Sequence, residues 1–461
     1  MRNQLIRKTL QQTRLLLALV VMFIAIANTA WASGGVGIYV DGQYYAPTTA
    51  SQNIARSSGY TSLFLFTTNV ETNGNITGFN TTLCQNGAYT GDTTWAAKLA
   101  ACKTAPSSVK RIEICIGSWG SQAFNNIRSL IAAQGTGTGS ILYRNFLALK
   151  NATGVDAIQF DDETTYDVNS MVAFGNMLAA IGLKVTLCPY TQQAFWVNVK
   201  SQLGSKVDAI YLQCYDGGAG NDPGNWINAF GGFKVTPGLW GNTETTASAF
   251  AKMQNWRNNL GIPGGFMWLN GTMQWDYQLW PPFFNIVFEN AAVYYAGSYG
   301  NPGTALQGTN DPYLNSANQY VSGCSEVADT SYNANAQQQW SIYPIGGGRW
   351  NIMNTSSGQL LQATGDPYHP HGSGNVAGCN KVVLTPNTWN NIWQSWQIGA
   401  AANGGLFFAN PANSQYVQST GDTYWSNFNQ FFVSGCSQMA GTPYSWGISD
   451  QDRWNLIFVR P

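Results

Sequence analysis

Short apolar runs alternate with amphipathic segments along the first part of the chain. Eight runs rich in β-forming residues occupy residues 35–40, 62–68, 111–117, 156–162, 184–190, 208–215, 234–240 and 264–270. Between them lie helical patterns, and those at 168–182 and 247–261 end at a glycine, a common helix stop. This alternation predicts βαβ units and a parallel sheet. Eight strands in about 235 residues fit a closed α/β barrel, the (β/α)8 or TIM barrel, which needs roughly 250. A doubly wound open sheet is the alternative fold. The sequence has no GxGxxG or GxxxxGK[ST] motif after an early strand, which argues against this alternative.

The pattern changes after about residue 290, where helical periodicity ends and Gly, Asn, Ser and Gln become frequent. An octapeptide recurs at spacings of 55 and 56, as LQGTNDPY (306–313), LQATGDPY (361–368) and VQSTGDTY (417–424). Each copy is followed by a Gly-Cys pair and then by an aromatic strand carrying Trp340, Trp396 or Trp454. Three β-type units in register predict an all-β β-trefoil domain with these tryptophans in its core. We therefore expect a barrel over 33–290 and a trefoil over 291–461.

The first 32 residues have the features of a secretory signal peptide. Basic residues precede an apolar stretch of 13 residues that starts at Leu15, and Ala30-Trp31-Ala32 forms a small-x-small cleavage site. An uncleaved anchor is the alternative, although the stretch is short for a membrane span. No later segment resembles a span, so we expect an exported monomer, extracellular or periplasmic.

Charge and cysteine usage exclude several classes of protein. The 22 basic and 22 acidic side chains balance, which argues against nucleic acid as a partner. The only histidines, His369 and His371, come too late for a Ser-His-Asp triad or a histidine-ligated metal in the first 368 residues, and no cysteine spacing indicates a metal site. Of the eight cysteines, Cys84 and Cys102 are the one candidate disulfide pair. The other six read as buried or loop thiols: Cys115, Cys188, Cys214, Cys324, Cys379 and Cys436.

The fourth strand ends in acidic residues, in the segment GVDAIQFDDE. Because side chains alternate along a strand, Gln159, Asp161 and Glu163 point the same way, toward the barrel interior. The carboxyl ends of the strands form the active-site mouth of such barrels. Paired carboxylates there suit glycoside hydrolysis, and their mutual field should raise the pKa of one member. The alternative is that the acidic strand end only caps a helix or binds a cation.

The segment DAIQFDDE resembles the DxxDxDxE signature of glycoside hydrolase family 18, the chitinase-like barrels, with Asp156, Asp161 and Glu163 at three of its acidic positions. Three further stretches resemble the family's third, sixth and eighth strands: ICIGSWG (114–120), YLQCYD (211–216) and GGFMW (264–268).

This resemblance implies substrate-assisted, retaining hydrolysis of β-linked N-acetylglucosamine glycans without a cofactor. Glu163 would be the general acid and base, Asp161 would orient the substrate's acetamido group, and Tyr215 would bond its carbonyl. The implied substrate-binding residues of the barrel are Tyr39, Gln159, Gln213, Asp216 and Trp268.

The barrel sequence departs from the family pattern at several positions. Gln159 replaces the middle Asp, and can hydrogen-bond Asp161 but cannot exchange a proton with it. Asp162 should face the helices and need a partner there. Cys115 and Ser118 replace small residues of the third strand.

The C-terminal repeats resemble the ricin B-type lectin module, whose repeats carry a Q-x-W strand. Gln338 and Gln394 precede tryptophans in this way, and Asp452 is a variant. An Asp and a Tyr recur in each repeat and are candidates for three shallow sugar sites, unless the Asp only closes a turn: Asp311 and Tyr313, Asp366 and Tyr368, Asp422 and Tyr424.

Two functions remain open. The first is a secreted chitinase or endo-β-N-acetylglucosaminidase that binds polysaccharide or glycoprotein glycans through an appended lectin module, which adds avidity. The second is a non-catalytic chitinase-like lectin.

Overall fold

The computed structural model describes residues 35–40, 42–268, 280–368, 370, 376–387, 391–427 and 429–460. The predicted signal segment, 1–32, and both histidines lie outside the described residues. Among the described residues, no helix is at once long and apolar enough to cross a bilayer.

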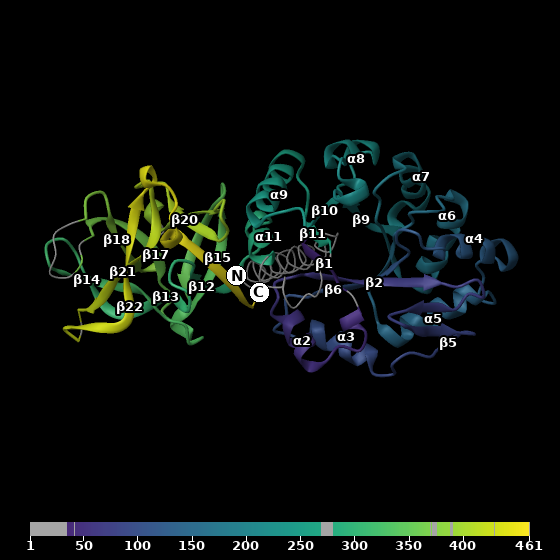
Figure 1. Cartoon of the computed structure of the whole chain (residues 1–461), viewed down its shortest axis with the longest axis horizontal. Helices are drawn as coiled ribbons and strands as arrows, with labels where there is room; N and C mark the ends of the chain where they lie inside the picture. The colour runs from purple at the N-terminus through teal and green to yellow at the C-terminus, as the bar shows by residue number, and fades with distance from the viewer. Residues whose placement is uncertain are drawn as a thin grey trace, which may run out of the picture.

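Eight parallel strands close into a barrel in the first unit (Figure 1). They are β1 (Val36–Val40), β2 (Ser62–Val70), β6 (Arg111–Ile116), β7 (Ala157–Phe160), β8 (Lys184–Leu187), β9 (Val207–Gln213), β10 (Thr236–Trp240) and β11 (Gly265–Trp268). Strand β1 pairs with both neighbours, with Ile38 opposite Leu63 of β2 and opposite Met267 of β11, which closes the ring. The eight predicted strands are confirmed.

Helices cover the outside of this barrel, as expected for a (β/α)8 fold. They are α2 (Thr49–Arg56), α3 (Trp95–Lys103), α4 (Ala123–Gln134), α5 (Ile141–Thr153), α6 (Val168–Ile181), α7 (Gln193–Leu203), α8 (Pro223–Ala229), α9 (Thr246–Leu260) and α11 (Pro281–Val287). Gly182 and Gly261 end α6 and α9 in the left-handed conformation, which confirms both predicted helix stops.

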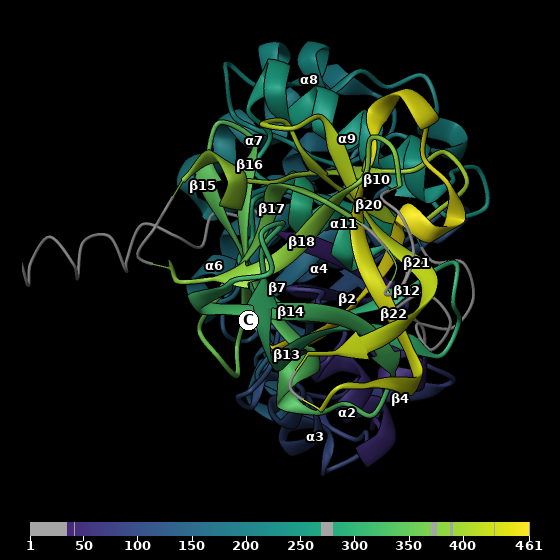
Figure 2. The ribbon, with the colours of Figure 1, turned by 90° about the vertical axis from the view of Figure 1, so that its left-hand side faces the viewer.

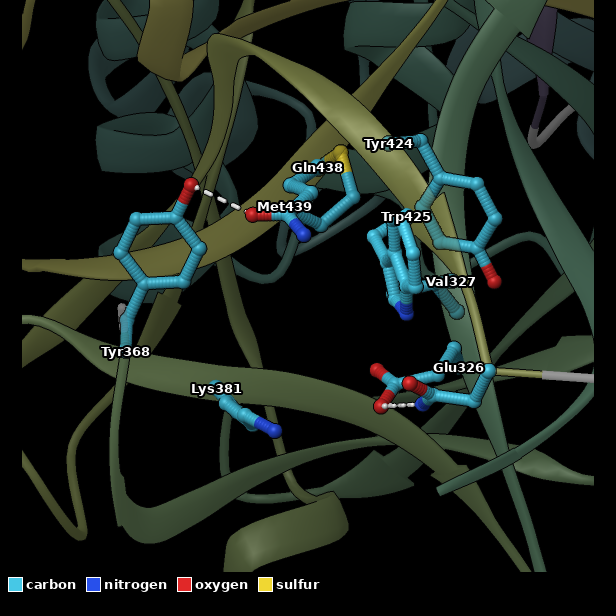
Figure 3. A pocket seen from close by; sticks show the side chains of 9 residues that line it. Glu326, Val327, Tyr368, Lys381, Tyr424, Trp425, Gln438 and Met439 are labelled. Atoms are coloured by element: carbon cyan, nitrogen blue, oxygen red, sulfur yellow. Dashed lines mark hydrogen bonds between the residues drawn. The ribbon is translucent and has the colours of Figure 1, made fainter. Parts of the chain in front are cut away.

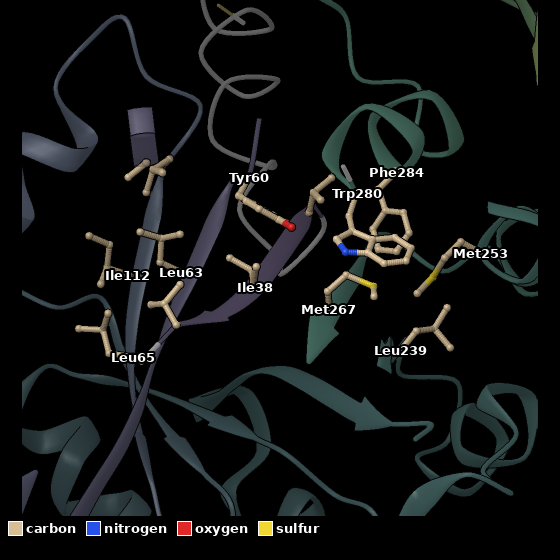
Figure 4. Close-up of a cluster of buried hydrophobic side chains, with 14 of the residues drawn as sticks. Ile38, Tyr60, Leu63, Leu65, Ile112, Leu239, Met253, Met267, Trp280 and Phe284 are labelled. Atoms are coloured by element: carbon tan, nitrogen blue, oxygen red, sulfur yellow. The ribbon is translucent and has the colours of Figure 1, made fainter. Parts of the chain in front are cut away.

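Apolar side chains on the outer face of the strands fill the layer beneath the helices. Figure 4 shows Ile38, Leu63 and Met267 from β1, β2 and β11 beside Trp280 and Phe284 from the α11 region. Burying each of these side chains contributes about 1.5–3 kcal/mol. This layer fixes the strands, and therefore the loops at their carboxyl ends.

An antiparallel extension that the sequence did not predict continues the sheet beyond β2. It consists of β3 (Ile76–Gly78), β4 (Thr81–Gln85) and β5 (Ala88–Tyr89). Strand β2 itself runs to Val70 in order to pair with β3.

A second sheet begins at Ala292, and its described part contains twelve strands in three consecutive sets of four. The first set is β12 (Ala292–Ser298), β13 (Thr304–Leu314), β14 (Tyr320–Ser331) and β15 (Gln339–Gly346). The second is β16 (Arg349–Asn354), β17 (Leu360–Pro367), β18 (Asn380–Thr385) and β19 (Gln397–Ala400). The third is β20 (Leu406–Asn410), β21 (Gln415–Ser426), β22 (Phe431–Pro443) and β23 (Arg453–Arg460). Figure 2 views this unit from its own side, with the barrel behind it.

The strand pairing of this unit has threefold character. The first and last strands of the sets form a ring, β12–β15–β16–β19–β20–β23, which the pairing of β23 with β12 closes. Between β16 and β19 the link is a single bridge from Trp350 to Trp396, the residue before β19. The middle strands form three hairpins, and β14, β18 and β22 pair with one another. Trp340, Trp396 and Trp454 are at most 1% exposed, and each indole N–H donates to a backbone carbonyl. Their predicted place in the core is confirmed.

The predicted disulfide is wrong. All eight cysteines lie in the described residues and all are free thiols. Cys84 is on β4 and Cys102 on α3, where its Sγ faces the carbonyl oxygen of Lys98 at 3.5 Å. Burial raises the pKa of the two thiols to about 12 and about 11, so both are inert.

Candidate active site

A cleft opens at the carboxyl ends of the barrel strands, with an empty volume of about 1150 Å³. It is lined by Phe66, Ser118, Trp119, Asp161, Glu163, Tyr190, Gln213, Tyr215, Asp216, Gly217 and Trp268. These residues lie at or just after the ends of β2, β6, β7, β8, β9 and β11. Active sites of (β/α)8 enzymes occupy this position.

Two carboxyl groups occupy the floor of the cleft. Strand β7 ends at Phe160, so Asp161 and Glu163 follow it directly. Their side chains are hydrogen-bonded to each other. Nε2 of Gln213 lies 3.0 Å from Oδ1 of Asp161 and 3.3 Å from Oε1 of Glu163, so one amide group contacts both carboxyls. The structure therefore brings together the two acids and Gln213, as predicted.

Burial raises the pKa of both acids, but to different degrees. Asp161 is 3% exposed, and burial together with the negative charge of Glu163 holds its pKa well above the usual range. Burial also raises the pKa of the half-buried Glu163, whereas its hydrogen bonds from Gln213 and Asp161 act in the opposite direction. The hydrogen bond between the two acids favours the proton on Asp161, with Glu163 as the acceptor. The pair holds a proton that an ordinary pair of carboxylates would lose.

Tyr39 and Gln159 lie beneath the floor of the cleft and not in its lining. Both side chains are fully buried, and the Tyr39 hydroxyl donates to Oε1 of Gln159 at 2.5 Å and lies 2.9 Å from Sγ of Cys188. Neither side chain lines the cleft, so both support its floor in this structure, and their contact with substrate stays a prediction. Gln159 also has no hydrogen bond to Asp161, since Tyr39 holds its oxygen and its buried Nε2 has no partner among the described atoms.

Aromatic rings form one wall of the cleft. Trp268 stacks on Tyr215, with ring centroids 5.8 Å apart and an angle of 14° between the planes. Phe66 meets Trp268 edge to face at 4.8 Å. Tyr215 and Trp268 were predicted to be in the site. Asp216, also predicted, lies at the exposed rim, where its charge contributes to raising the pKa of Glu163.

Asp162 points away from the cleft, as predicted. It is 1% exposed and accepts hydrogen bonds from the backbone N–H groups of Thr164, Thr165 and Tyr166. The loop after β7 therefore supplies the hydrogen-bond donors that the buried Asp162 carboxylate needs. Burial nevertheless raises its pKa.

Five lining residues were missed from the sequence: Phe66, Ser118, Trp119, Tyr190 and Gly217. Trp119 is 86% exposed at the mouth of the cleft. Each stands at or after the carboxyl end of a predicted strand, which is the signal that could have identified them.

The six Asp and Tyr candidates of the C-terminal repeats form hydrogen bonds between repeats. The Tyr313 hydroxyl donates to Asp366, the Tyr368 hydroxyl to Asp422 at 2.7 Å, and the Tyr424 hydroxyl to Asp311 at 2.5 Å. We call these six residues the Tyr–Asp ring. The tyrosines are only 4–5% exposed, so these pairs connect the repeats, and sugar binding at them stays a prediction.

Comparisons with known proteins found no matching family model and no matching curated protein. Among solved structures, the chain is similar to the Bacillus cereus spore cortex-lytic enzyme SleL, with 13% identity over 56% of this chain and 74% of that chain and a TM-score of 0.38. It is also similar to the designed threefold symmetric protein ThreeFoil, with 15% identity over 36% of this chain and 99% of that one and a TM-score of 0.27. An exo-β-1,3-galactanase from Clostridium thermocellum matches with 15% identity over 36% of this chain and 30% of that chain, with a TM-score of 0.25. With every score below 0.5, these likenesses decide neither fold nor function.

Proposed function

We propose that the protein is a secreted glycoside hydrolase that cleaves β-linked N-acetylglucosamine glycans by substrate-assisted, retaining hydrolysis. The observation that carries the proposal is the pair of adjacent, proton-holding carboxyls, Asp161 and Glu163, in a large aromatic cleft at the carboxyl ends of the barrel strands.

In this mechanism Glu163 protonates the glycosidic oxygen of the leaving sugar and later takes a proton from water. The substrate's acetamido oxygen attacks the anomeric carbon, so the protein needs no nucleophile of its own. Asp161 transfers its proton to Glu163, which supplies the proton for the leaving oxygen, and Asp161, now a carboxylate, accepts a hydrogen bond from the acetamido N–H. The Gln213 amide, which contacts both acids, stabilises whichever of them is charged.

The aromatic wall supplies the binding surface. The stacked rings of Trp268 and Tyr215 offer an apolar face for a pyranose, and the Tyr215 hydroxyl is the donor for the acetamido carbonyl. Trp119 at the mouth extends this surface to a neighbouring sugar unit.

We further propose that the C-terminal unit is a β-trefoil module of the ricin B-lectin type that holds glycans near the barrel. The six-stranded ring, the three mutually paired hairpins and the three buried tryptophans support this. A bound glycan would raise the local substrate concentration by bivalency.

The test is to incubate the full chain with N-acetylglucosamine oligomers at several pH values between about 4 and 8. Chromatography then measures the hydrolysis products. We expect Glu163→Gln to lower the rate at least about 100-fold, because the general acid is lost, while oligomer binding persists. Glu71→Gln is the matched control, since Glu71 is an exposed glutamate outside the cleft lining, and should keep full activity. Wild-type protein that binds oligomers but releases no product would instead establish the chitinase-like lectin.

A further inference from the structure

The centre of the C-terminal unit combines a symmetric backbone with three different side chains. Strands β14, β18 and β22 pair with one another there, with Glu326 opposite Val383, Lys381 opposite Ala440 and Gln438 opposite Ala328. Glu326, Lys381 and Gln438 each follow the repeat's Gly-Cys pair by two residues, so they occupy one equivalent position. An acid, a base and an amide therefore converge on the threefold axis.

These three residues line one solvent-open cavity, which we call the axial cavity; its volume is about 490 Å³ when the open space at its mouth is counted. Its other lining residues are Val327, Tyr368, Tyr424, Trp425, Asn427 and Met439. Figure 3 shows the labelled side chains standing around a common space, with Lys381 and Glu326 on different sides of it.

The backbone of one residue, Leu314, holds both the acid and the base in place. Nζ of Lys381 donates to the carbonyl oxygen of Leu314 at 2.9 Å, and the N–H of Leu314 donates to the Glu326 carboxyl. Nδ2 of Asn427 also donates to Oε1 of Glu326 at 3.3 Å. Lys381 and Glu326 do not appear among the ion pairs of the described residues, so neither charge is neutralised by direct contact with the other. Burial raises the pKa of Glu326 to about 7.

These groups define the chemistry of a ligand. Above about pH 7, where Glu326 is charged, the acid and the base cancel in net charge, which favours a neutral molecule. The ligand must donate hydrogen bonds to a carboxylate, accept them from an ammonium, and do either with an amide. Adjacent hydroxyl groups on a ligand can do all of this, because each hydroxyl both donates and accepts. Trp425, which meets Phe432 edge to face at 5.0 Å, adds an aromatic surface of the kind that packs on sugar rings.

We propose that the axial cavity binds a single neutral sugar residue through Glu326, Lys381, Gln438 and Trp425. The proposal rests on the proposed glycan-binding role of the C-terminal unit and does not depend on hydrolysis in the barrel. It gives one site per chain, because the three equivalent positions hold three different side chains.

The experiment is calorimetric titration of the full chain with four probes: the methyl glycosides of glucose, galactose, mannose and N-acetylglucosamine. We expect at least one of the three that lack the acetamido group, which the barrel is proposed to recognise, to bind with a stoichiometry of one. Lys381→Met, Glu326→Gln and Trp425→Ala should each weaken that binding at least tenfold. Trp446→Ala removes a 60% exposed tryptophan outside the cavity and should leave the affinity unchanged.

The wild-type stoichiometry is informative even where a variant fails to fold. Three bound sugars per chain, or binding that all three variants retain, would overturn the axial site while leaving the glycan-binding role intact. Absence of binding by all four glycosides would overturn both proposals. Binding of free glycine, a zwitterion, that is lost in Lys381→Met while no glycoside binds would show that the cavity takes a charged ligand instead.

Discussion

The Tyr–Asp ring should stabilise the C-terminal unit, and Tyr424→Phe is the sharpest test of that role. The Tyr424 hydroxyl donates to the buried Asp311 at 2.5 Å, and removing it leaves that carboxyl with the Ser426 hydroxyl at 3.1 Å. A hydrogen bond to a charged group contributes about 1.5–3 kcal/mol, and the Ser426 contact puts the expected loss near the middle, about 2 kcal/mol. For a unit of this size each kcal/mol shifts the melting temperature by roughly 2–4 °C, so we expect a drop of about 4–8 °C.

The assay is differential scanning calorimetry of the full chain, with Tyr320→Phe as the matched control. Tyr320 lies in the same unit but is 62% exposed, so removing its hydroxyl should change the melting temperature by less than about 1 °C. A Tyr424→Phe shift as small as that of the control would refute the reasoning. Loss of glycan binding without loss of stability would return these residues to the role of sugar ligands.

Of three further predictions, two concern the barrel and one the thiols of the whole chain. The raised pKa of Asp161 means that its acid form stabilises the fold at low pH and that this contribution is lost as the pH rises through the folded-state pKa. The melting temperature of Asp161→Asn should therefore rise relative to that of wild type as the pH increases from about 4 to 8. Parallel plots of melting temperature against pH for the two proteins would contradict this. A Cβ on Gly117, at φ +88°, would lie 2.4 Å from the carbonyl oxygen of Asp161, whereas Gly120, at φ +74°, has open space. Gly117→Ala should thus cost several-fold more activity than Gly120→Ala, and equal losses would show that the contact is unimportant. Thiol titration in denaturant without reductant should find eight free thiols, and six would show a disulfide.

The barrel strands could be predicted because buried strands are apolar on both faces and stand out between amphipathic helices. The β3–β5 extension could not, since its strands are only two to five residues long, and their stability comes from pairing with the end of β2. The Tyr–Asp ring was missed for a related reason. The repeat reveals that an Asp and a Tyr recur, but their pairing joins residues of different repeats.

The catalytic candidates could be predicted because alternation along β7 fixes the direction of their side chains. Depth in the barrel is not fixed by alternation. Gln159 and Asp161 point the same way, yet Gln159 is covered by Tyr39 and only Asp161 reaches the cleft. Proximity in sequence was equally misleading for Cys84 and Cys102, which belong to a strand and a helix with separate packing.

The central claim is that Asp161 and Glu163 hydrolyse a β-linked N-acetylglucosamine glycan with help from the substrate's acetamido group. The most direct measurement is proton NMR of chitotetraose during its first minutes with the wild-type full chain. We expect the β-anomer of the product to form first, because attack by the acetamido oxygen and then by water retains configuration. First appearance of the α-anomer, or no product at any pH between about 4 and 8, would contradict the account.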